Sequence, residues 1–97
     1  MALVRLSQPL FPAGDIVMTQ GVSDLIQRGE LNPSPYLQRH LAGDWGDLCD
    51  EDRRTNDDAL KHSDRLFSRY QVTPALTIWI ITEWNRSVTT LLLPSEY

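Results

Sequence analysis

Residues 66–93 read LFSRYQVTPALTIWIITEWNRSVTTLLL, and this stretch decides the fold. From Leu66 to Val72 the side chains alternate between two faces, as in a strand with one buried face. After a turn at Thr73-Pro74, residues 76–83 are nearly all apolar, which is typical of a strand in the middle of a sheet. A hairpin connection at residues 83–86, in which we expect a positive φ at Asn85, leads to a last strand over 88–93. The stretch predicts an antiparallel three-stranded meander.

Upstream of the meander the spacing of apolar residues is helical. Residues 16–19 form a short strand, and a two-turn helix follows from Thr19 or Gln20 to Arg28, with Gly29 as its stop. Ser34 and Pro35 mark the start of a second helix, which ends at Gly43. A third helix runs from about Asp50 to His62, and its middle has no apolar residue, so we expect half of it to face solvent.

We therefore predict an α+β, two-layer fold in which N-terminal helices pack on a three- or four-stranded antiparallel sheet. Residues 1–97 form a single domain, because a chain of 97 residues has room for only one small core. Whether the early strand joins the sheet stays open at this point.

Composition excludes several classes of protein. Hydrophobic residues make up 41% of the chain and charged residues 23%, as in ordinary globular proteins. No apolar run is long enough for a membrane helix, and no secretory signal pattern is present. The lone Cys49 cannot form an internal disulfide, which agrees with a cytoplasmic protein. Thirteen acidic against nine basic residues give a net charge of −4, the wrong sign for a general nucleic-acid binder.

The acidic residues cluster in one segment. Residues 44–58 contain seven acids against Arg53 and Arg54, and the seven are Asp44, Asp47, Asp50, Glu51, Asp52, Asp57 and Asp58. One interpretation is an anionic surface that docks on a basic protein, and the other is a solvated helix whose first-turn acids suit the macrodipole. A two-carboxylate metal site at Asp47 with Asp50 or Glu51 lacks the spacing of a calcium loop. We predict neither a metal nor a cofactor.

A catalytic alternative rests on His40. This histidine lies near Asp44, and an acid-base role would need a phosphate-binding group such as Arg86, with Ser87 or Thr89 as a donor to the transition state. These residues would make a small endoribonuclease of the barnase-like or toxin type, with helices before a sheet. A histidine on an apolar helix face is more often packed and hydrogen-bonded, and the sequence favours a binding protein over an enzyme.

Tryptophans mark candidate contact points. Trp79 falls in the central strand and is expected in the core or at the interface between the helices and the sheet. Trp45 lies in a loop, where it either plugs the edge of the core or anchors a partner. Trp84 lies at the hairpin tip, where burial within the domain is hardest, and is a candidate anchor for a partner or for a homodimer that pairs its hairpins.

A series of short motifs runs along the chain: Leu10-Phe11-Pro12 with Gly14, Ile16-Val17 and Thr19, Arg39-His40, Gly43-Asp44-Trp45-Gly46-Asp47, Glu51-Asp52, Ile78-Trp79-Ile80-Ile81-Thr82-Glu83, Arg86-Ser87, Thr89-Thr90 and Leu92-Leu93-Pro94. These motifs resemble a family of small proteins carried on bacterial plasmids, integrative elements and phages, usually labelled plasmid-related or hypothetical and sometimes type I restriction subunits. The resemblance runs from Leu10 to Tyr97. The chain departs from the family at Gln20, Ser63 and Asn85, where proline, glycine and aspartate are usual. The resemblance implies a mobile-element context and transfers no activity.

Together these features predict a small acidic accessory protein of a mobile element that modulates a host or element protein. Its sharpest form is an anti-defence inhibitor, directed against restriction or CRISPR machinery. The expected partner is a protein with a basic surface, with no direct contact to nucleic acid or membrane, and a homodimer is compatible with this. The expected contact residues are Asp44, Trp45, Asp47, Asp50, Glu51, Asp52 and Trp84.

Overall fold

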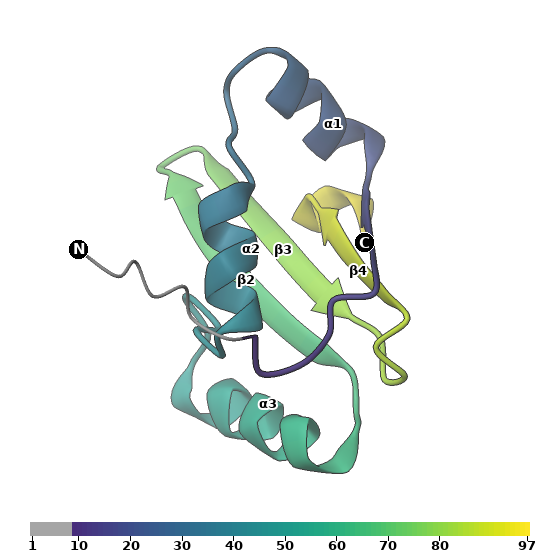
Figure 1. Ribbon diagram of the computed structural model, residues 1–97. Coiled ribbons are helices and arrows are strands. Elements are labelled where there is room, and N and C mark those ends of the chain that lie inside the picture. The colour runs from purple at the N-terminus through teal and green to yellow at the C-terminus, as the bar shows by residue number, and fades with distance from the viewer. Residues whose placement is uncertain (1–8) are drawn as a thin grey trace, which may run out of the picture.

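The predicted meander forms the centre of the molecule. A computed structural model describes residues 9–97, and in it β2 (Leu66–Thr73), β3 (Leu76–Thr82) and β4 (Val88–Leu92) pair antiparallel in sequence order (Figure 1). Partners in the register include Tyr70 with Ile78 and Ile80 with Leu91. These alternate residues all lie on the buried face, which is the pattern the sequence indicated.

The sheet is mixed, so the prediction of a purely antiparallel sheet was wrong. Strand β1 (Asp15–Met18) joins it beside β4 and runs parallel to that strand, which gives the order β1-β4-β3-β2. Gly14 lets the chain enter β1 close beside Ser87. Its φ is +66°, and a Cβ at this position would lie 2.3 Å from the Ser87 carbonyl oxygen. The three helices therefore come in mid-chain, between β1 and β2, and not at the N-terminus.

The helices have nearly the predicted bounds: α1 (Gln20–Gln27), α2 (Ser34–Leu41) and α3 (Asp50–His62). Helix α1 is capped by a residue distant in the sequence. The Thr19 side chain does not cap the helix but donates its hydroxyl to Glu96, and the same carboxylate accepts the Gly21 N–H. Glu96 belongs to the C-terminal 3₁₀ turn η1 (Pro94–Glu96), so the end of the described chain supplies the cap of its first helix.

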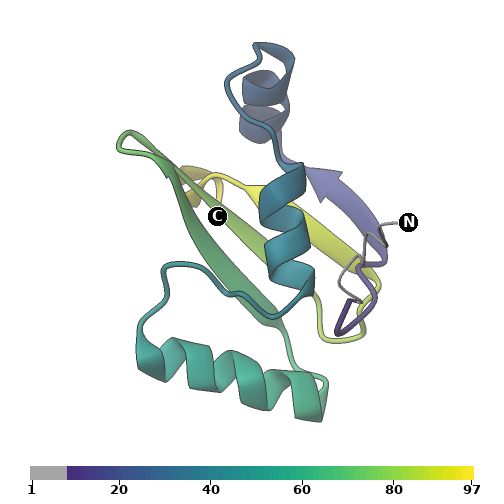
Figure 2. The ribbon, with the colours of Figure 1, turned by 60° about the vertical axis from the view of Figure 1, so that its left-hand side comes forward.

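Two apolar clusters lie between the helices and one face of the sheet. The first contains Val22, Leu31, Tyr70, Ile78, Ile80 and Leu91, and the second contains Phe11, Trp45, Leu48, Ala59 and Leu66. Helix α2 crosses the sheet between α1 and α3, which lie toward its two ends (Figure 2). The other face carries a smaller aromatic row in which Trp79 packs edge-on against both Phe67 and Tyr97. Trp79 is thus partly buried on the face away from the three helices, and the expectation that it lies in the core or at the helix-sheet interface was wrong.

Two turns place ordinary residues in the left-handed region. At the β3–β4 hairpin the positive φ belongs to Arg86 (58°), not to Asn85, whose side-chain oxygen accepts the Ser87 N–H instead. At the end of α3, Ser63 has a φ of 56°. Glycine is the residue best suited to that position, because it lacks the Cβ that makes the left-handed conformation costly.

Candidate functional site

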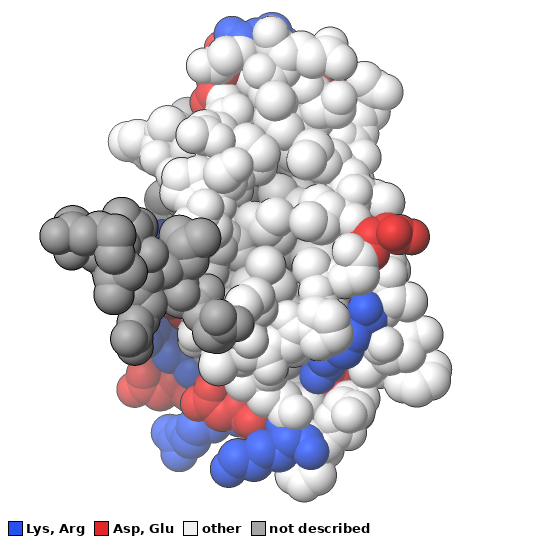
Figure 3. All heavy atoms as spheres, viewed as in Figure 1, with Lys and Arg blue, Asp and Glu red and all other residues white. Residues whose placement is uncertain are grey.

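The seven acidic residues of segment 44–58 are all exposed, on α3 and on the loop before it. We call the carboxylates of Asp44, Asp47, Asp50, Glu51, Asp52, Asp57 and Asp58 the acidic surface. In the space-filling view, charged side chains gather most densely around α3, whereas most of the surface above it is uncharged (Figure 3). The sequence prediction that α3 would face solvent on one side is confirmed.

Three of these carboxylates are used inside the molecule. Asp44 binds the Arg39 guanidinium at 2.7 Å, Asp47 accepts the backbone N–H of Gln71 at 2.8 Å, and Asp57 accepts the indole N–H of Trp45 at 3.0 Å. The hydrogen bond from Arg39 lowers the pKa of Asp44 from its usual value. These three contacts tie the loop to α2, to β2 and to α3, respectively.

The other four carboxylates have no partner of this kind in the described chain. Within residues 9–97, the side chains of Asp50, Glu51, Asp52 and Asp58 make no hydrogen bond or ion pair. Neighbouring Arg53 does not neutralise them directly, because its guanidinium donates to the carbonyls of Leu48 and Gly46. The result is a set of unpaired anions on a rigidly held helix.

Asn56 is the residue that holds α3 most directly, and it is not among the residues predicted from the sequence. Its side chain is 4% exposed and faces β2, where it accepts the Phe67 N–H and donates to the Phe67 carbonyl. The Asn56 amide thus makes the two hydrogen bonds that the backbone of a neighbouring strand would otherwise make. A polar residue in the middle of a largely charged helix gave no sequence signal for this role, because Asn is equally common on a solvated helix.

The two candidate tryptophan anchors have opposite environments. Trp45 is only 4% exposed and packs against Phe11 and His40, so it plugs the core edge and is not a surface anchor. A large apolar ring with one N–H is suited to this place, since Asp57 satisfies the indole nitrogen. Trp84 is 63% exposed at the β3–β4 hairpin and is accessible to a partner.

His40 lies at the centre of a buried polar chain. Its Nδ1 pairs with the Ser68 hydroxyl and its Nε2 with the Thr82 hydroxyl at 2.9 Å; Thr82 in turn pairs with Thr89, which donates to the Ala13 carbonyl at 2.7 Å. Burial first, and the nearby Arg86 charge second, lower the pKa of His40 from 6.5 to about 3. With no exposed surface and both ring nitrogens engaged, His40 has the environment of a structural residue.

The remaining residues of the ribonuclease alternative are not arranged as an open site. The Arg86 guanidinium donates to the carbonyls of Ala59, Asp64 and Glu83, so it caps the end of α3 and is not available to a phosphate in this arrangement. Ser87 bonds to Asn85, away from the histidine. Thr89 does belong with His40, but only as the next member of the buried chain. This geometry offers a substrate no contact with the acid-base residue.

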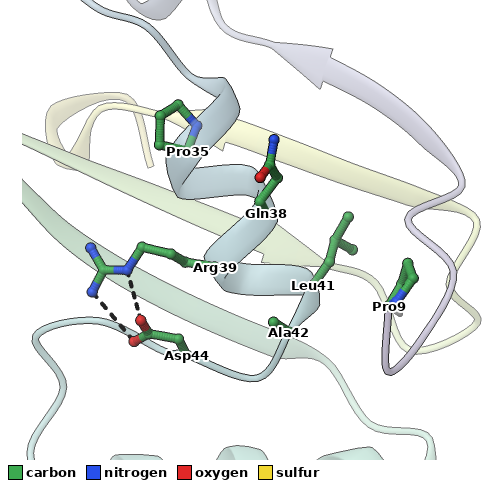
Figure 4. Close-up of a pocket in the computed structure, with 7 residues that line it drawn as sticks. All are labelled: Pro9, Pro35, Gln38, Arg39, Leu41, Ala42 and Asp44. Carbon is green, nitrogen blue, oxygen red and sulfur yellow. Dashed lines mark hydrogen bonds and ion pairs between the residues drawn. The ribbon is translucent and has the colours of Figure 1, made fainter. Parts of the chain in front are cut away.

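A hollow of about 550 Å³ lies along the outer side of α2, lined by Pro9, Pro35, Gln38, Arg39, Leu41, Ala42 and Asp44 (Figure 4). Its charged groups, Arg39 and Asp44, point toward one another and form the ion pair already described. The hollow is open and contains no nucleophile or unpaired acid, so it supplies no chemistry of its own. Within residues 9–97 no cluster of three His, Cys, Asp or Glu side chains is placed to bind a metal.

No family model, curated protein or solved structure matches this chain at a significant level. The resemblance to mobile-element proteins therefore stays a prediction. Among the described residues, no helix is both long and apolar enough to cross a membrane.

Proposed function

We propose that this protein acts by binding a protein with a basic surface through the acidic surface of α3. The observation that carries the proposal is the set of four exposed carboxylates, Asp50, Glu51, Asp52 and Asp58, that have no internal partner in the described chain. Because α3 is fixed by Asn56 and Arg53, these anions are already in place before a partner arrives. A preorganised charged surface loses little conformational entropy on binding.

The chemistry of such a surface fits a nucleic-acid-binding protein as the partner. A groove lined with Lys and Arg to receive phosphates also attracts a row of carboxylates, and the attraction speeds association. Arg86 ties the hairpin to the C-terminal end of α3, so the exposed Trp84 provides an apolar contact at that end of the helix, away from its acidic first turn. In the mobile-element context that the sequence suggests, the specific form of the proposal is an inhibitor of restriction or CRISPR machinery.

The test compares two variants of equal charge. Tagged protein is mixed with nuclease-treated bacterial lysate, and bound proteins are identified over a salt gradient. The first variant, Asp50→Asn with Glu51→Gln and Asp52→Asn, removes three unpaired acids. The control, Asp24→Asn with Glu30→Gln and Asp64→Asn, removes three acids outside the acidic surface.

We expect one basic protein to be retained at low salt and released at high salt, because exposed charges are screened by ions. With that protein purified, the first variant should bind at least about tenfold more weakly and the control should bind as the wild type does. The proposal would be refuted if the bound protein were retained equally at low and high salt, or if the two variants bound it with equal affinity.

A further inference from the structure

The two edge strands of the sheet differ in whether their outward-facing backbone groups have hydrogen-bond partners. At the β2 edge, the outward backbone groups are satisfied one after another. Asn56 pairs with Phe67, the Trp45 carbonyl and the Asp47 N–H pair with Arg69, and the Asp47 carboxylate accepts the Gln71 N–H. An edge closed in this way cannot take up another strand.

The β1 edge has no such cover within residues 9–97. The N–H groups of Asp15 and Thr19 donate to the carbonyls of Ser87, just before β4, and Leu91, within it. Because backbone groups alternate in direction along a strand, the N–H and C=O groups of Ile16 and Met18 point away from the sheet. The structure gives these outward groups no partner in the described chain.

The side chains of β1 are also unusual for an open edge. Ile16, Val17 and Met18 are 45%, 43% and 42% exposed. The three carry no charge, and the strand has no proline or bulge of the kind that normally protects an edge from pairing. In register with β4, Ile16 and Met18 lie on the helix-covered face and Val17 on the other, so both faces of the edge are apolar.

We propose that β1 pairs antiparallel with β1 of a second copy of this chain, about a twofold axis that passes between the two Val17 residues. In this register Ile16 of each copy lies opposite Met18 of the other. The four outward backbone groups of one strand then meet their complements on the other, and the two four-stranded sheets become continuous.

The main concentration of acidic residues lies away from this seam. The same register places the one acid of the strand, Asp15, opposite Thr19, whose hydroxyl donates to Glu96, so each end of the seam carries one carboxylate from each copy. The acidic surface belongs to α3 and the loop before it, which pack on β2 at the opposite edge, so the two copies meet without bringing their acidic surfaces together. With a strand of only four residues the interface is smaller than a standard one, and the dimer should dissociate on dilution.

The test is charge complementation at the twofold axis, followed by sedimentation equilibrium of the full chain. Wild type should show twice the 11.1 kDa mass at high concentration. Val17→Lys and Val17→Glu should each be monomeric, because each places like charges opposite one another. An equimolar mixture of the two should regain the doubled mass, which a variant that had merely unfolded could not do.

Trp84→Lys is the matched control, because Trp84 is the most exposed apolar side chain of the hairpin and the other place where copies could meet. We expect it to remain dimeric. The proposal is overturned if wild type is monomeric up to about 1 mM, if Val17→Lys stays dimeric, or if Trp84→Lys alone abolishes the dimer.

Discussion

At the scale of single residues, the least expected feature is a histidine with no solvent contact that forms one hydrogen-bonded chain with three other polar side chains. His40, Ser68, Thr82 and Thr89 lie between the two apolar clusters, and each is fully buried. Such a network is stabilising only while every member is satisfied. The neutral imidazole meets this condition, because one nitrogen can donate and the other accept.

This arrangement predicts a pH dependence of stability. The folded-state pKa of His40 is lowered to about 3, below its unfolded value of 6.5, so between these values the unfolded state binds one more proton. The contribution of His40 to the free energy of unfolding is fully present above pH 6.5 and is lost as the pH falls toward 3. From pH 7 to pH 5 the free energy of unfolding should fall by about 2 kcal/mol, measured by urea titration.

The two histidines supply the control for this experiment. His62 is exposed at the end of α3, so His62→Gln should keep the pH dependence of the wild type. His40→Gln should be less stable at pH 7 but should lose the change between pH 7 and pH 5. A wild-type stability that is flat over this range would show that the imidazole is accessible to protons in the folded state.

At the scale of elements, α3 owes its position to a side chain that imitates a strand. Replacing Asn56 by Ala leaves the N–H and C=O groups of Phe67 without their partner. We expect Asn56→Ala to lower the free energy of unfolding by about 1–3 kcal/mol, as measured by thermal or urea unfolding. Thr55→Ala, which removes an exposed hydroxyl one residue away, should stay within about 0.5 kcal/mol of wild type. Equal losses in both variants would mean that water replaces the amide.

The elements themselves were largely predictable, and their pairing was less so. Strands β2 to β4 follow from local alternation and short connections, which sequence patterns carry well. The parallel pairing of β1 with β4 joins residues 73 positions apart, Asp15 with Val88, and no local pattern encodes it. The same reason explains the tryptophans: exposure of Trp84 follows from a hairpin tip, whereas burial of Trp45 depends on Phe11 and α3, which only the assembled fold brings together.

For the whole molecule, the acidic surface and the β1 edge are far enough apart that their binding equilibria should respond separately to salt concentration. The acidic surface lies on α3 beside β2, and the apolar β1 edge lies at the other side of the sheet. Binding through carboxylates weakens as ions screen them, whereas pairing of apolar strands is insensitive to salt or strengthened by it.

Raising the salt from low concentration to about 0.5 M should therefore dissociate the basic partner and leave the dimer intact. The measurement is sedimentation of the wild-type protein alone and with its partner over the same salt series. Because the two equilibria use different residues, Val17→Lys should retain the salt-sensitive binding, and the Asp50, Glu51 and Asp52 variant should retain the doubled mass. If one substitution abolished both partner binding and dimerisation, the two surfaces would form a single interface. The β1 edge would then bind a partner that spans the sheet from edge to edge, and not a second copy of this chain.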